Sequence, residues 1–132
     1  MKIDIDWYND ERRILIYRFL ENWTVKGLEE ALATAELMGD DVPDYIIFEM
    51  THSPYVPNDF LNIRHAVSEY KHEQVKVRVI VGASNMLTVV YRALRYIFPS
   101  VASTMVFVAT FDEAIDLIQN HETYALKPQT GV

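Results

Sequence analysis

Apolar and charged residues alternate in the first eight residues, MKIDIDWY. Ile3, Ile5 and Trp7 are separated by single charged positions, and this two-residue period is typical of a strand with one solvent-facing side. The turn-forming segment NDER at 9–12 follows, and residues 14–19 are again mostly apolar. We therefore predict two strands joined as an antiparallel hairpin.

Helical spacing begins after Trp23, where Thr24 is a suitable N-cap residue. Apolar residues then recur every three or four positions up to Gly39, which predicts a helix. The same spacing predicts three more helices: one starting at Asn58 or Asp59, one over residues 85–98, and one after Thr110. In the last of these, Thr110 and Glu113 have the spacing of a capping box.

Three further apolar segments, at 45–50, 75–81 and 105–109, are predicted to be strands. The resulting order, ββαβαβαβα, predicts an α/β fold with four helices and a mixed, mostly parallel sheet of about five strands. The first strand is then an antiparallel edge, and the run at 45–50 is a central strand. We expect residues 1–119 to form a single domain and residues 120–132 to be a weakly ordered C-terminal tail.

Composition excludes several classes of function. The chain has 132 residues, no cysteine and a net charge of −7, so disulfides, thiolate chemistry and cysteine-ligated zinc are ruled out. The negative charge argues against a nucleic-acid partner, which requires clustered Lys and Arg. No apolar run approaches the length of a membrane span, and the N-terminus does not resemble a secretion signal. We expect a cytoplasmic protein.

The sequence contains no motif of an enzyme or cofactor site. It lacks the glycine-rich turns that bind dinucleotides and phosphates, and its four histidines are never spaced i, i+4 as metal ligands on one helix would be. His52 and Ser53 are adjacent, but a loop rich in Ser and Pro explains both residues without a catalytic role. We therefore predict a protein without catalytic residues, metal or cofactor.

The loop at 51–59, THSPYVPND, follows the predicted central strand. Ligands and partners of such sheets usually meet the carboxyl ends of the strands. We accordingly expect the loop to be a surface bend that contacts a protein partner or a second copy of the chain. Tyr55 and Val56 either tuck under the loop or contact the partner. The candidate contact residues are Thr51, His52, Tyr55, Val56, Asn58 and Asp59.

An alternative function is the binding or sensing of a small apolar, lipid-like ligand beside the helix at 85–98. The residues that would line such a pocket are Met86, Val90, Tyr91 and Leu94. Methionine and aromatic residues at helical spacing, including Tyr91 and Tyr96, are more typical of a protein core.

Three segments together resemble a STAS domain, the module shared by sulfate transporters and anti-sigma factor antagonists. They are YIIFEM at 45–50, VIVGASNMLTVVYRAL at 79–94 and FVATFDEAIDLI at 107–118, and the likeness extends over about residues 14–119. The resemblance implies a protein-interaction or regulatory module that binds partners around the loop and helix start after the third strand.

Phosphorylatable members of that family carry D-S-[ST]-G at this helix start, whereas the corresponding residues here are PNDF at 57–60. Asp59 stands where the phosphate-accepting hydroxyl would be. Two interpretations remain open: Asp59 or Asn58 caps the following helix, or Asp59 permanently supplies the charge of a phosphate. Thr51 and Ser53 are alternative phosphate acceptors.

Overall fold

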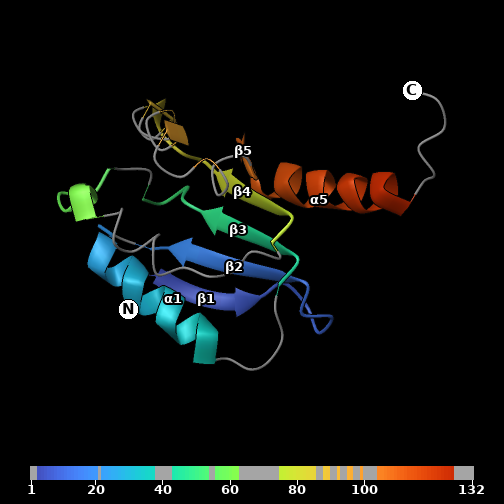
Figure 1. The fold of residues 1–132 in the computed structure, drawn as a ribbon, viewed down its shortest axis with the longest axis horizontal. Helices are drawn as coiled ribbons and strands as arrows, with labels where there is room; N and C mark the ends of the chain where they lie inside the picture. Colours follow the sequence, from blue (N-terminus) through green and yellow to red (C-terminus); the bar gives the residue numbers. More distant parts are fainter. Residues whose placement is uncertain are drawn as a thin grey trace.

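The computed structural model describes residues 3–20, 22–37, 43–53, 56–62, 75–85, 88–89, 92, 95–96, 99 and 104–126. Within them lies one five-stranded sheet with the strand order β1-β2-β3-β4-β5 (Figure 1). The strands are β1 (Ile3–Trp7), β2 (Ile14–Phe19), β3 (Tyr45–Glu49), β4 (Val77–Val81) and β5 (Met105–Val108).

Strand β1 pairs antiparallel with β2, and every other neighbouring pair is parallel. The predicted hairpin, mixed sheet and central third strand are therefore confirmed. In β3 the first three residues are fully buried, as expected of a strand covered on both faces.

Two α-helices are found in the described part of the chain, α1 (Val25–Leu37) and α5 (Phe111–Leu126), together with a short 3-10 helix, η1 (Phe60–Asn62). Four α-helices were predicted. The helix predicted after Asn58 starts as η1 and then lies outside the described residues. Within the helix predicted at 85–98, the residues that the structure describes have a helical backbone. The Thr88 N–H donates to the Ser84 carbonyl at 3.1 Å, as in a helical turn.

Helix α5 ends at Leu126 and so extends into the segment predicted to be a weakly ordered tail. His121, in this extension, explains part of the difference. Its Nδ1 lies 3.0 Å from the hydroxyl of Tyr45, and the two rings meet edge to face. Because Tyr45 is fully buried on β3, this contact ties the second half of α5 to the sheet.

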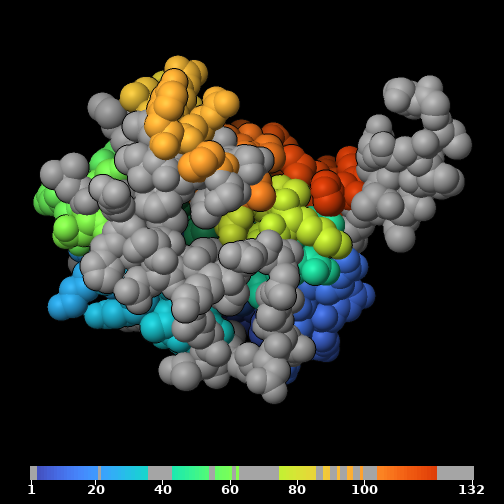
Figure 2. All heavy atoms as spheres, viewed as in Figure 1, coloured from blue at the N-terminus to red at the C-terminus, as the bar shows by residue number. Residues whose placement is uncertain are grey.

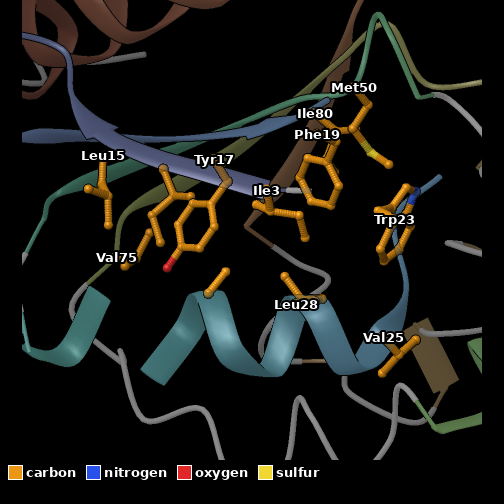
Figure 3. Close-up of a cluster of buried hydrophobic side chains, with 12 residues drawn as sticks. Ile3, Leu15, Tyr17, Phe19, Trp23, Val25, Leu28, Met50, Val75 and Ile80 are labelled. Carbon is orange, nitrogen blue, oxygen red and sulfur yellow. The ribbon is translucent and has the colours of Figure 1, made fainter. Parts of the chain in front are cut away.

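Two hydrophobic cores lie on opposite faces of the sheet, which follows from the alternation of side chains along each strand. Figure 1 shows α1 on one side and α5 on the other. On the α1 side, Leu15, Tyr17 and Phe19 of β2 point toward the helix (Figure 3) and share a buried cluster with Val25 and Leu28. Trp23, just before the Thr24 cap, and Leu28, four residues after it, both belong to this cluster, which is the arrangement of a hydrophobic staple.

The α5-side core contains the intervening residues of the same strands. Ile16, Ile47 and Val79 are buried there against Ala114 and Ile118 of α5. Central strands covered on both faces must be apolar at every position, which accounts for the nearly continuous apolar sequence of β3.

Arg78 is the exception to this apolar pattern. It lies on the α1 face of β4, is only 4% exposed, and its Nη1 donates a hydrogen bond to Thr104 Oγ1 at 2.5 Å. A buried guanidinium must be hydrogen-bonded to offset the loss of its hydration.

None of the helices in the described part of the chain is both long and apolar enough to cross a membrane.

Candidate functional site

The carboxyl edge of the sheet brings together the loops that follow β3, β4 and β5. Met50, directly after β3, is buried, and its N–H donates to the Val81 carbonyl at 2.9 Å. Gly82, directly after β4, donates to the Val108 carbonyl at 3.1 Å. These bonds continue the sheet ladder by one residue, so the start of the 51–59 loop is held against the neighbouring strand end.

Thr51 forms the first exposed turn of this loop. The Glu49 carboxylate accepts hydrogen bonds from the Thr51 backbone N–H, at 2.9 Å, and from the Thr51 hydroxyl. The Ser53 N–H donates to the Met50 carbonyl at 3.0 Å and closes the turn. The bend after β3 thus has a hydrogen-bonded geometry of its own.

Gly82 allows the loop after β4 to approach this turn. Its φ is +71°, a left-handed conformation that residues with a Cβ rarely adopt. A Cβ at this position would lie 2.8 Å from Thr51 Oγ1 and 2.9 Å from Thr51 Cα. Glycine is therefore required here both by conformation and by space.

Asp59, at the end of the 51–59 loop, binds the start of α1. Its Oδ1 accepts the Val25 N–H at 2.9 Å, and its Oδ2 lies 3.3 Å from the Lys26 N–H, which donates to it. The Thr24 hydroxyl accepts the next amide, that of Gly27, at 3.0 Å. The first three amides of α1, which have no partner within the helix, are thereby all satisfied.

Of the two residues predicted to cap the following helix, Asn58 and Asp59, the structure corrects Asp59, because both of its carboxylate oxygens bond to α1 instead. Among the described residues, backbone hydrogen bonds close the turn into η1. The Phe60 N–H donates to the Pro57 carbonyl at 3.1 Å, and the Asn62 N–H donates to the Asp59 carbonyl at 2.9 Å. A carboxylate at a helix N-terminus also interacts favourably with the helix dipole, so Asp59 stabilises α1 rather than η1.

Apart from Asp59, the predicted contact residues fall into three groups. Thr51, His52 and Asn58 are exposed. Val56 is half-buried and packs against the α1-side core, so of the two alternatives for this residue the structure shows the tucked one. Tyr55 lies outside the described residues. In the described part of 51–59, the exposed surface is therefore polar.

Ser53 is unsuited both to the catalytic role that the sequence argued against and to the alternative role of phosphate acceptor. It is fully buried, whereas His52 beside it is exposed, so the two side chains do not form a solvent-accessible nucleophile and base. A kinase would also not reach the Ser53 hydroxyl in this conformation. Of the two alternative phosphate acceptors, only Thr51 is exposed.

The residues predicted to line an apolar pocket, Met86, Val90, Tyr91 and Leu94, lie outside the described residues. Tyr96, predicted to belong to the core, is 91% exposed, and Val89 is 56% exposed. The prediction for Tyr96 is wrong, because it faces solvent. Helical spacing identifies residues that share one face of a helix. It does not show whether that face packs against the rest of the protein or faces solvent.

Among the described residues, no group of three or more histidine or acidic side chains is placed to hold a metal ion. The carboxylates at this edge bond to the protein itself: Asp59 to backbone amides and Glu49 to Thr51. The exposed hydrogen-bonding side chains in the described part of the loop are those of Thr51, His52 and Asn58.

No protein-family model matches this chain, and no curated protein sequence is significantly similar to it.

Proposed function

We propose that this chain is a non-enzymatic, STAS-like module that binds another protein through the exposed side chains of Thr51, His52 and Asn58. The order of its elements and the sheet topology are compatible with that family. The carboxyl edge is where ligands of such sheets usually bind.

The observation that carries the proposal is the pair of hydrogen bonds from Val25 and Lys26 to the carboxylate of Asp59. They connect the end of the 51–59 loop to α1, while the Glu49 carboxylate fixes its beginning. A surface that is ordered before binding loses less conformational entropy when the partner arrives.

The same bonds argue against a phosphorylation switch at residues 57–60. A phosphate introduced there would interact favourably with the positive N-terminal end of a helix dipole. The carboxylate of Asp59, however, already accepts the first two backbone N–H groups of α1. The segment also has no hydroxyl side chain. We propose that the interaction surface stays in one state unless it is controlled elsewhere.

Site-specific photo-crosslinking in a native extract tests this function. The crosslinking amino acid replaces His52 or Asn58, and a matched control carries it at Asp10, an exposed residue in the β1–β2 turn. We expect one discrete crosslinked protein from positions 52 and 58 and none from position 10. The same pattern from all three positions, or no crosslink from 52 and 58, would refute the proposal.

A second variant separates binding from folding. Thr51→Arg introduced into the crosslinking protein should abolish the crosslink at position 58 because it places a bulky charge at the centre of the surface. Lys26→Glu, which changes an exposed residue of α1 and leaves its backbone N–H in place, should preserve the crosslink. Circular dichroism and thermal melting establish that both variants are folded.

A further inference from the structure

Strand β1 is the outermost strand of the sheet and, among the described strands, pairs with β2 alone. It lies at the lower edge of the sheet in Figure 1, and the β1–β2 hairpin, coloured dark blue, reaches the surface on the right of Figure 2. The backbone groups on the outer side of an edge strand can pair with an extended segment of another chain. We therefore asked which segment β1 would accept.

The β1–β2 ladder shows which backbone groups of β1 point outward. The N–H of Tyr8, directly after β1, donates to the Ile14 carbonyl at 2.9 Å and continues the register of the two strands. Hydrogen-bonded and non-hydrogen-bonded pairs alternate along an antiparallel ladder, so the even-numbered residues of β1 bond to β2. The N–H and C=O groups of Ile3, Ile5 and Trp7 therefore point away from β2.

The outer side of β1 is accessible at Ile5 and Trp7. Ile3 is only 1% exposed and is therefore covered, whereas Ile5 and Trp7 are half-buried and pack at the border of the α1-side core. Outside the β1–β2 ladder, no backbone hydrogen bond of Ile5 or Trp7 is found among the described residues. A strand added at this edge can bond to both residues and pack its own apolar side chains beside theirs.

Asp4 and Asp6 determine the charge that such a strand must carry. Both are exposed and project from the face of the sheet opposite to that of Ile5. Arg18 of β2 lies opposite Asp4, and its Nη1 is 3.9 Å from Asp6 Oδ2. One guanidinium offsets only part of the charge of two carboxylates, and an exposed pair at this distance contributes little. The intervening residues of an added strand therefore lie beside a negative surface.

A second copy of β1 does not fit this edge. When two such strands pair antiparallel through their outward backbone groups, odd-numbered residues face odd-numbered residues, and even-numbered residues face even-numbered residues. Registers that overlap at the middle of the strand thus set Asp4 or Asp6 of one copy opposite Asp4 or Asp6 of the other. Like charges directly opposite each other destabilise a strand pair, so the edge disfavours self-pairing and favours basic residues.

We propose that β1 binds an extended segment of another protein in which basic residues alternate with apolar residues. The backbone of this segment bonds to Ile5 and Trp7, and its Lys or Arg side chains face Asp4 and Asp6. Nucleic acids and anionic membranes do not fit, because their charge has the same sign as the two carboxylates. The site lies on a side edge of the sheet, separate from the 51–59 loop, and does not depend on the function proposed for that loop.

A synthetic peptide of about seven residues in which lysine alternates with valine is the probe. It is titrated into the isotope-labelled full chain up to about 1 mM. At saturation, amide exchange at Ile5 and Trp7 should slow at least about tenfold, because their N–H groups become hydrogen-bonded. A peptide with glutamate in place of lysine should bind at least about tenfold more weakly, because it sets like charges opposite Asp4 and Asp6.

Two further peptides test the backbone pairing. One is N-methylated at every valine and the other at every lysine. Because alternate N–H groups of a strand point to opposite sides, only one of the two peptides loses the groups that face β1. That peptide should not bind, and the other should bind.

Charge reversal tests the role of the carboxylates. Asp4→Lys with Asp6→Lys should exchange the preference, so that the glutamate peptide binds more tightly than the lysine peptide. The matched control is Asp112→Lys with Asp116→Lys, which makes the same change of charge at exposed positions of α5. It should keep the preference of the wild type. Circular dichroism checks the fold of both variants.

Four results would overturn the inference. These are the absence of binding up to about 1 mM, binding that leaves exchange at Ile5 and Trp7 unchanged, equal affinity for the lysine and glutamate peptides, and an unchanged preference in the Asp4 and Asp6 variant. A wild-type chain that sediments as a dimer, with the amides of Ile5 and Trp7 already protected without peptide, would also overturn it, because a second copy would then occupy the edge.

Discussion

The carboxylate of Asp59 accepts the backbone N–H of Val25 at 2.9 Å, although the two residues are 34 positions apart in sequence. The contact joins the loop after β3 to the first turn of the helix before β3. Because the bond satisfies an amide that α1 itself leaves without a partner, one side chain contributes both to the stability of the helix and to the position of the loop.

Asp59→Ala should lower the free energy of unfolding by about 1–2 kcal/mol, the usual loss when a side-chain cap of a helix is removed. Asp59→Asn should cost less, because the amide oxygen still accepts one N–H. Urea unfolding followed by circular dichroism gives both values.

Asn58→Ala is the matched control for this pair, since Asn58 is the exposed neighbour of Asp59. It should change the free energy of unfolding by less than about 0.5 kcal/mol, as is usual at the surface. If Asp59→Ala and Asn58→Ala lower the free energy of unfolding by the same small amount, the carboxylate of Asp59 does not cap α1.

Gly82→Ala should destabilise the fold by more than about 1 kcal/mol, because the residue has positive φ and a new Cβ would lie 2.8 Å from Thr51 Oγ1 and 2.9 Å from its Cα. Adding Thr51→Ala should not restore stability, because the close backbone atom remains. Thermal and urea unfolding measure the single and double variants. Full recovery in the double variant would show that only the hydroxyl, and not the backbone, requires glycine.

The hydroxyl of Tyr45 and the ring of His121 should be energetically coupled, because they lie 3.0 Å apart and connect β3 to the second half of α5. A double-mutant cycle with Tyr45→Phe and His121→Ala measures the coupling free energy of the two side chains. We expect a value of about 0.5–1.5 kcal/mol. Strictly additive losses would mean that the second half of α5 is not held by this contact.

Local sequence patterns correctly predicted the elements that depend on interactions between residues close together in the sequence. The alternation of Ile3, Ile5 and Trp7 predicted β1. Thr24 was predicted as a cap from its residue type and position, and its bond to Gly27 spans only three residues. In the predicted capping box, the Thr110 hydroxyl accepts the Glu113 N–H at 3.2 Å. The Glu113 carboxylate, however, accepts the N–H of Ala109 at 3.3 Å, one residue before the expected partner.

The remaining features depend on tertiary packing that local patterns do not encode. Asp59 was identified as a capping residue, but nothing near it indicates that the helix it caps is α1. Ser53, at the end of the turn that begins at Met50, is buried by the surrounding fold. Likewise, α5 continues into the segment predicted to be a tail, where His121 contacts Tyr45, a residue 76 positions away in sequence.

Amide hydrogen exchange at Val25 and Lys26 tests most directly whether Asp59 holds the 51–59 loop against α1. In the folded wild type both amides should exchange slowly. Asp59→Ala should accelerate them about tenfold, corresponding to the loss of one hydrogen bond, while Gly27, bonded to Thr24, changes less. Equal exchange rates at Val25 and Lys26 in the wild type and in Asp59→Ala would contradict the account.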